Sequence, residues 1–285
     1  MPAKHSLPHL RTTRLFDLSV VTESFVKILD VLTTQSNTTR GGKTLLVATP
    51  NPEQVVLSQE NKSFQQALQN MNILLPDGIG LVLASRMFAA AGKAVPIVSR
   101  VTGVDIVQAL LTEATQAGKT VLVVGGRGYE HLGTPAKQFS KDAGRADASA
   151  HVMVLEIPAE GGIHTCYWME GYADAHTPTK EEEQFVEKVI RTLKPTYVFI
   201  ALGAPVQEHW LVAHAELLQE NAVAVGMAVG GAFDMLTGKL DRAPAWMQAL
   251  HLEWLYRLYQ EPWRWRRQLN LLKFIKLTVG ELLAE

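Results

Sequence analysis

The sequence of 285 residues contains a single cysteine, Cys166, so no disulfide can form within the chain and nothing indicates an oxidising compartment. No segment reaches the roughly 18 to 20 consecutive apolar residues that a membrane-spanning helix needs. No apolar run follows the charges of the first residues, as a secretory signal would require. We therefore expect a protein of the cell interior, whose contact with any membrane is peripheral.

Several motifs that would define a class of enzyme are missing. No two aspartates stand two residues apart, so the D-x-D motif that holds a divalent cation in many nucleotide-sugar enzymes is absent. His209 and His214 are five residues apart, which is the wrong spacing for two metal ligands on one face of a helix. No nucleophile elbow supports serine catalysis, and no G-x-G-x-x-G fingerprint supports a bound dinucleotide. The sequence therefore predicts no metal ion, and a dinucleotide-dependent oxidoreductase remains only as an alternative.

An excess of charge is missing as well, because the formal net charge is −1 and no field of the whole molecule attracts nucleic acid. The charge is unevenly distributed, however: from residue 242 to 276 there are seven lysines and arginines and two acidic residues. Four of the six tryptophans lie in the same stretch: Trp246, Trp254, Trp263 and Trp265. Aromatic side chains beside cations suit a membrane surface, and an ordinary C-terminal helix packed on a core explains the pattern equally well.

Along the rest of the chain, short apolar runs alternate with segments of helical periodicity. We expect strands at residues 43–49, 72–75, 120–125, 150–157, 196–202 and 222–229. We expect helices at residues 18–35, 63–70, 79–90, 102–117, 179–193 and 206–220, others after Asn51 and Gly128, and an irregular stretch at 158–177. Strands separated by such helices predict parallel crossover units. The expected fold is a Rossmann-like α/β sheet flanked by helices over residues 1–242, with a helical C-terminal appendage over residues 243–285.

Ligands of open parallel sheets bind beyond the carboxyl ends of the strands, and two of the turns at such ends carry side chains suited to chemistry. Asp77 lies in P-D-G-I-G, where it could stabilise a turn or cap a helix. It could instead act as a general base that takes a proton from an attacking hydroxyl. Thr49 and Asn51 in T-P-N-P-E have the same ambiguity, because Asn51 is placed to cap a helix that begins at Pro52.

Two further turns offer groups that could hold phosphate or sugar. Gly125, Gly126 and Gly128 of G-G-R-G leave backbone amides at the start of an expected helix, where an anion is stabilised. A plain tight turn explains these glycines equally well. Gln207 lies in the first turn of an expected helix beside the strand ends, where its amide could hold sugar or phosphate oxygens.

These motifs occur in an order that resembles one family. The series consists of T-P-N-P-E at 49–53, L-P-D-G-I-G at 75–80, S-R-V-T-G-V-D at 99–105, G-A-P-V-Q-E at 203–208, V-G-G-A-F-D at 229–234, and R-A-P with L-E-W-L-Y-R-L-Y-Q-E-P-W-R-W-R-R in the tail. It resembles the WecG/TagA/CpsF glycosyltransferases over about residues 43–276. Each motif alone is weak, and the ordered set is specific.

The resemblance implies an inverting, metal-independent transfer of an N-acetylmannosamine-type sugar from a UDP-sugar to N-acetylglucosamine on a polyprenyl diphosphate. Such a reaction serves the synthesis of teichoic acid or another cell-surface polysaccharide. The implied partners are the donor, the lipid-linked acceptor and the inner face of the cell membrane, which the appendage would contact from the cytoplasm. No cofactor and no nucleic acid are implied, and homo-oligomerisation stays open. Residues 89–95 make the spacing longer than is usual in the family, so Arg100 is placed by its S-R-V-T-G-V-D context. A loose match at 158–177 leaves another UDP-hexose as an alternative.

Carried over by motif, the resemblance also implies roles for single residues. Asp77 resembles the catalytic base, with Thr49 and Asn51 as its companions, and Arg100 and Gln207 resemble substrate-binding residues. Arg257, Arg264 and Arg267 occupy the family's R-x₆-R-x₂-R positions, where arginines would complete the site around the diphosphate. A membrane-associated scaffold without enzymatic activity, with the tail as its working part, remains a third hypothesis.

Overall fold

The computed structural model describes residues 10–37, 43–139, 151–159 and 162–283, without the side chains of Arg264, Arg266, Arg267 and Gln268. The chain divides into two compact units. The first comprises Met1–Ile28, Ala48–Gly103 and Gly238–Glu285, and the second comprises Leu29–Val47 and Val104–Thr237. The tail is therefore part of the first unit.

The first unit contains a hairpin that the sequence did not indicate. β1 (Thr12–Leu15) and β2 (Leu18–Val21) pair in antiparallel register, and β2 pairs in parallel with β4 (Ile73–Leu74). The helix predicted over residues 18–35 is wrong at its start, since α1 spans Phe25–Asn37. Leu18 and Val20 are buried while Ser19 between them is exposed. This alternation is the burial pattern of a strand rather than of a helix.

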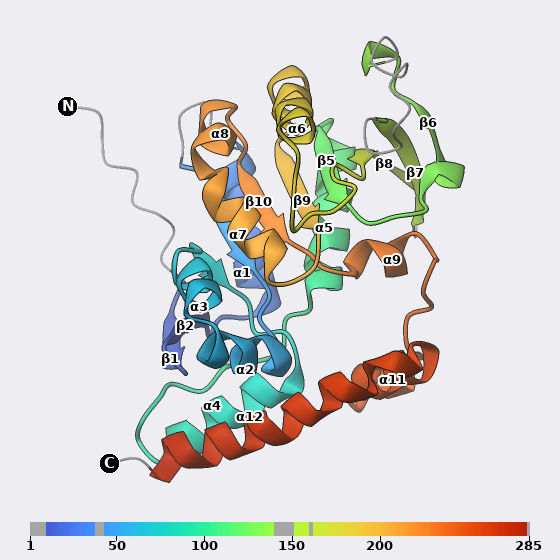
Figure 1. Cartoon of the computed structure of the whole chain (residues 1–285). Coiled ribbons are helices and arrows are strands. Elements are labelled where there is room, and N and C mark those ends of the chain that lie inside the picture. The colour runs from blue at the N-terminus through green and yellow to red at the C-terminus, as the bar shows by residue number, and fades with distance from the viewer. Residues whose placement is uncertain (1–9, 38–42, 140–150, 160–161, 284–285) are drawn as a thin grey trace, which may run out of the picture. The chain divides into compact units, whose positions relative to one another are not determined.

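The helices of the first unit come from the middle and the end of the chain. They are α2 (Pro52–Glu60), α3 (Lys62–Gln69), α4 (Ile79–Ala90), α10 (Ala245–Ala249), α11 (Glu253–Gln260) and α12 (Trp265–Leu283). A short 3₁₀ turn, Pro262–Arg264, separates α11 from α12, as expected where proline removes a backbone donor. Figure 1 shows the long helix α12 lying along α2 and α4. Helix α12 thus packs on the helices of the segments that follow β3 and precede Arg100.

The second unit is built on a mostly parallel sheet. β3 (Leu45–Ala48), β10 (Val225–Ala228), β9 (Tyr197–Ala201), β5 (Val121–Gly125) and β8 (Gly162–Met169) are parallel neighbours in that order. β7 (Met153–Ala159) and β6 (Gly133–Pro135) extend it in antiparallel register. The described helices of this unit include α5 (Gly103–Ala117), α6 (Lys180–Leu193), α7 (Val206–Ala213), α8 (Ala215–Glu220) and α9 (Ala232–Leu236). The predicted α/β class with a largely parallel sheet is confirmed.

Three sequence predictions in the second unit are corrected. Residues 162–169 form the strand β8 rather than an irregular stretch, with Cys166 and Trp168 buried at alternate positions. The helix expected after Gly128 is instead a 3₁₀ turn of three residues, Glu130–Leu132, followed by β6. The helix predicted over residues 206–220 breaks at His214, the C-cap of α7. The other predicted strands and helices are present with ends shifted by a few residues.

Candidate active site

Three predicted site segments of the first unit meet where β3 and β4 end. Three backbone hydrogen bonds join them: Leu75 N–H to Ala48 O (2.8 Å), Asp77 N–H to Pro50 O (3.1 Å) and Val101 N–H to Pro76 O (3.0 Å). The first two continue the sheet direction beyond the strand ends, and the third attaches the chain at Arg100. Thr49, Asp77 and Arg100 are therefore brought together by the main chain, as the rule for parallel sheets predicts.

Glycines allow these segments to approach closely. A Cβ atom on Gly78, which has φ +93°, would lie 3.0 Å from Pro52 Cδ. A Cβ atom on Gly103 would lie 3.3 Å from Thr49 Oγ1. Both positions are in contact with the T-P-N-P-E turn, so glycine is what lets the turn pack against the Asp77 loop and against the start of α5.

Asn51 has the capping role that its local sequence indicates. It is the N-cap of α2, and its Oδ1 accepts a hydrogen bond from Gln54 N at 3.0 Å. The Gln54 side chain returns a bond to the backbone N–H of Asn51 at 3.1 Å, which completes a capping box. Capping uses the carbonyl oxygen of the Asn51 side chain and leaves its Nδ2 group available for substrate, so the two readings of this residue are compatible.

Asp77 is half-buried and firmly placed by its backbone. Its N–H group lies 2.9 Å from Leu75 O in addition to the 3.1 Å bond to Pro50 O. The N-cap position of α4 belongs to Gly78, so the helix-cap position considered for Asp77 is taken by its neighbour. The main chain thus places Asp77 at the carboxyl edge of the sheet, where ligands of open parallel sheets bind.

Arg100 makes an ion pair that no local sequence pattern predicts. Its Nη2 donates to Glu253 Oε2 on α11, 153 residues further along the chain. The other carboxylate oxygen of Glu253 lies 3.5 Å from Arg242 Nε. One carboxylate of the tail therefore lies between two guanidinium groups, next to the loop that carries Asp77.

The three tail arginines of the sequence prediction lie around the break between α11 and α12. Arg257 is on α11, and its Nε donates to Glu261 Oε2 at 2.8 Å. Arg264 ends the 3₁₀ turn and Arg267 is in the first turn of α12, and their side chains lie outside the described part of the structure. The backbone therefore assigns all three positions to the same unit as Asp77, and their contact with a diphosphate stays a prediction.

The contacts that hold the long helix α12 include a buried aromatic side chain and polar side chains. Phe274 is buried, and its ring meets Phe16 edge-on at a centroid distance of 5.3 Å. Lys273 Nζ lies 2.7 Å from Glu60 Oε1, and Lys93 Nζ donates to the carbonyl oxygen of Leu282 at 3.0 Å. The exposed side of the helix is apolar as well, with these exposed side chains: Trp265, Leu269, Leu272, Ile275, Val279 and Leu283. The helix therefore has a packed side and an uncovered apolar side.

In the second unit, Gln207 connects the first turn of α7 to the end of β10. Its Oε1 accepts a hydrogen bond from Gly230 N at 3.0 Å, and its Nε2 donates to Glu208 Oε1 at 2.9 Å. Both side chains are buried, and burial raises the pKa of Glu208 to about 7. Gln207 thus fixes the turn after β10, and a ligand could use only the Nε2 hydrogen that Glu208 does not receive.

The glycine turn after β5 is explained largely by packing. A Cβ atom on Gly125, with φ +97°, would lie 2.7 Å from the carbonyl group of Ala201. Gly126 donates its N–H to Ala201 O at 3.1 Å and packs under the Tyr129 ring, whereas Gly128 is exposed. Because a 3₁₀ turn of three residues follows, the described residues 126–139 provide no α-helix N-terminus for a phosphate. Nucleotide binding at these glycines stays a prediction.

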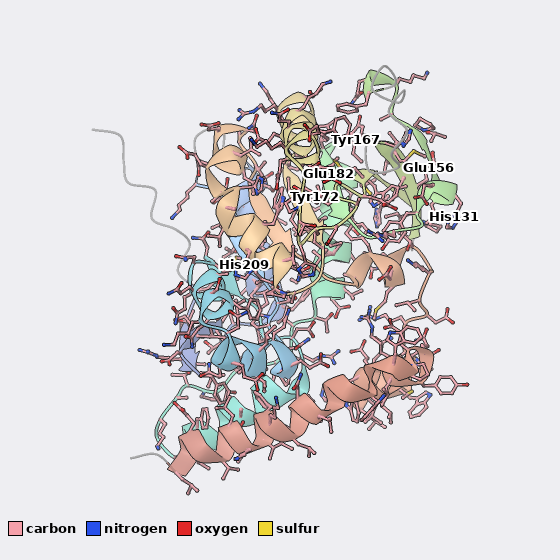
Figure 2. The ribbon with its side chains drawn as sticks, in the orientation of Figure 1. His131, Glu156, Tyr167, Tyr172, Glu182 and His209 are labelled. Atoms are coloured by element: carbon pink, nitrogen blue, oxygen red, sulfur yellow. The ribbon has the colours of Figure 1, made fainter. Side chains whose placement is uncertain are left out.

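Sequence reasoning missed a buried polar network in the second unit. Tyr172 accepts a hydrogen bond from Trp210 Nε1 at 2.6 Å and donates to Glu183 Oε2 at 3.0 Å, and Figure 2 shows Tyr172 beside Glu182 at the start of α6. Burial raises the pKa of the Tyr172 hydroxyl. His214 stacks on Trp210 at 4.0 Å and reaches Glu183. The hydrogen-bonded partners are 11 to 38 residues apart, so no local motif reveals the network, which braces α6 against α7.

Among the residues that the structure describes, no three histidine, cysteine or acidic side chains gather closely enough to hold a metal ion. None of the helices described is both long and apolar enough to cross a membrane. Cys166 is buried in β8, which raises the pKa of its thiol to about 12.

A carboxylate at the end of parallel strands lies where ligands of α/β proteins bind, and arginines in the same unit suit a phosphate-bearing ligand. Comparison with known proteins makes the class specific. The model of the glycosyl transferase WecG/TagA/CpsF family matches residues 14–285. The chain therefore belongs to this family and is a glycosyltransferase.

Two curated relatives show how similar the chain is to characterised members. It is 32% identical over 252 residues to the N-acetylglucosaminyldiphosphoundecaprenol N-acetyl-beta-D-mannosaminyltransferase of Bacillus spizizenii, covering 88% of this chain and 83% of that protein. It is 30% identical over 236 residues to the protein of the same name from Bacillus subtilis, covering 83% of this chain and 79% of that protein. The likeness therefore extends over most of both chains.

Proposed function

We propose that this glycosyltransferase moves N-acetylmannosamine from its UDP donor to N-acetylglucosamine on a polyprenyl diphosphate, with inversion at the anomeric carbon. The observation that supports this most strongly is the shared name of the two relatives, which align over more than four fifths of this chain. The arrangement at the strand ends agrees with it, because one carboxylate and several arginines of a single unit suit an acceptor hydroxyl and a diphosphate.

In the proposed mechanism, Asp77 is the general base. Its carboxylate takes the proton of the acceptor hydroxyl as that oxygen attacks the anomeric carbon from the side opposite to UDP. The new carbon–oxygen bond forms while the bond to the diphosphate oxygen breaks, and the electron pair leaves with UDP. General-base assistance of this kind contributes about 10²- to 10⁴-fold to a rate. Thr49 Oγ1 and Asn51 Nδ2 are proposed to hold the sugar near this carboxylate.

The leaving diphosphate needs positive charge, and we propose that arginines supply it without a metal ion. Guanidinium groups bind phosphate through two parallel hydrogen bonds and keep their charge at any physiological pH. Arg100 and the tail positions Arg257, Arg264 and Arg267 are the proposed donors. These arginines would stabilise the negative charge on the diphosphate more in the transition state than in the ground state. This difference is what accelerates the transfer. Gln207, Gly125, Gly126 and Gly128 remain proposed contacts of the donor.

The acceptor is anchored in a bilayer, so we propose that α12 brings the enzyme to the membrane surface from the cytoplasm. The exposed apolar side of α12 faces away from Phe274, and Lys276 on the same helix is also exposed. Apolar side chains that enter the headgroup region, together with cations that meet anionic lipids, give peripheral binding.

The experiment that tests the function offers the purified protein synthetic polyprenyl-diphosphate-N-acetylglucosamine with a panel of UDP-sugars and reads the products by mass. We expect the fastest transfer from UDP-N-acetylmannosamine, at the same rate with EDTA as without it. Faster transfer from another UDP-hexose would contradict the proposed sugar, and full dependence on added Mn²⁺ would contradict the metal-free mechanism. No transfer from any donor would contradict the function as a whole.

A further inference from the structure

Glu253 is an acidic residue of the tail that contacts Arg100 of the proposed active site. It is the first residue of α11, and its two oxygens approach different arginines: Oε2 receives Nη2 of Arg100, and Oε1 lies 3.5 Å from Nε of Arg242. The side chains of Arg100 and Glu253 are 13% and 20% exposed, so this pair is shielded from water more than an ordinary surface ion pair.

The pairing fixes Arg100 without neutralising the cluster. Two guanidinium groups and one carboxylate carry a net positive charge, which still suits a phosphate-bearing ligand. The interaction uses Nη2 of Arg100, and among the described residues no other polar partner takes its Nε or Nη1 hydrogens. A planar guanidinium held at one corner keeps its remaining donors in a defined direction.

The backbone connects this ion pair to the proposed base. Arg100 directly precedes Val101, whose N–H binds Pro76 O, and Pro76 directly precedes Asp77. An arginine fixed from the tail therefore lies on the segment that is hydrogen-bonded to the loop of the proposed base. If α11 undocks from the first unit, Arg100 loses Glu253, the partner that orients its guanidinium group.

We propose that Glu253 is a positioning residue that orients Arg100 for the diphosphate of the donor and so makes catalysis depend on a seated tail. This inference rests on the proposed function, in which Arg100 binds the leaving group. The same contact could instead serve only to hold α11, or Glu253 could compete with the diphosphate for Arg100. These three roles predict different behaviour of the same variants.

The test measures UDP affinity by titration calorimetry, and KM and kcat for UDP-N-acetylmannosamine, in full-length Glu253→Gln. Glutamine keeps the shape and removes the charge, so we expect the Kd for UDP and the KM for the donor to rise about tenfold, the usual effect of removing one charged hydrogen bond. Glu253→Asp should recover part of the loss. The matched control is Glu60→Gln, which removes the exposed ion pair of the tail with Lys273 and should leave both values unchanged.

A double-mutant cycle with Arg100→Ala separates the roles. If Glu253 acts through Arg100, Glu253→Gln should change UDP affinity by less than about twofold once Arg100 is already alanine. An equal loss in both backgrounds would overturn the inference in favour of holding α11. Tighter UDP binding by Glu253→Gln would overturn it in favour of competition, and unchanged values would overturn it outright. A wild-type protein that neither bound UDP nor transferred the sugar would refute the proposed function itself, and this inference with it.

Discussion

Replacing Phe274 by alanine should release α12 from the rest of the first unit. Phe274 is the largest buried side chain that this helix contributes among those the structure describes, at 3% exposure. Its ring meets Phe16 in the turn between β1 and β2, and Phe16 meets Phe88 of α4 at 5.6 Å. The phenylalanine thus joins α12 to the hairpin and, through it, to α4.

The size of the change in helix docking follows from comparing the lost phenylalanine contacts with the ion pair that would remain. Truncating a buried phenylalanine costs about 3–5 kcal/mol. The Lys273–Glu60 pair is more than half exposed on both sides and contributes at most about 1 kcal/mol. A loss of about 3 kcal/mol corresponds to roughly a hundredfold change in the equilibrium between docked and released helix. Backbone amides of residues 265–283 should therefore exchange with deuterium about two orders of magnitude faster, as followed by mass spectrometry of peptides.

Leu272→Ala is the matched control, because Leu272 lies two residues away on α12 and is 66% exposed. Its exchange should equal that of the wild type. Two outcomes would refute the reasoning. Unchanged exchange of α12 in Phe274→Ala would mean that other contacts hold the helix, and equal acceleration in the buried strand β10 would mean global unfolding rather than release of the tail.

Other predictions concern Gly125 and Glu208 of the second unit. Gly125→Ala should lower the free energy of unfolding by roughly 2–6 kcal/mol, because φ is +97° and the new Cβ would meet Ala201. Gly92→Ala, with φ +72° and open space around it, should cost only about 1 kcal/mol, and equal costs in denaturant melts would contradict the packing argument. Glu208, with a pKa raised from 4.5 to about 7, keeps a proton in the folded protein that the unfolded chain releases, so stability should fall as pH rises through this window, by about 3 kcal/mol in total. Glu208→Gln should remove that part of the slope, and identical pH profiles of unfolding would contradict it.

The parts of the fold that the sequence predicted carry their signals locally. Asn51 and Pro52 define the start of α2 locally, and Asn51 caps the helix as expected; the capping box with Gln54 is an addition of the structure. Thr179 and Glu182 mark α6 in the same way. The predicted site residues at the ends of β3 and β4 were brought together because parallel strands end at one edge of a sheet.

The parts that were missed depend on partners distant in sequence or on unusual backbone. The turn between β1 and β2 places Phe16 and Asp17 at φ +51° and +62°, where a hairpin turn is usually marked by glycine or asparagine. β8 is stabilised by pairing with β5 and β7. Its own sequence pattern does not stand out from the glycine and polar residues around it. The pairing of Arg100 with Glu253 spans 153 residues, and only the folded chain reveals it.

The most direct test of the account is the single-turnover rate of transfer from UDP-N-acetylmannosamine to polyprenyl-diphosphate-N-acetylglucosamine by the wild type and by Asp77→Asn. Asparagine keeps the size of the side chain and cannot accept the proton at neutral pH. We expect the rate to fall by about a hundredfold or more, with UDP affinity and thermal stability unchanged. A folded Asp77→Asn enzyme that transferred the sugar at the wild-type rate would contradict the assignment of the base and the mechanism built on it.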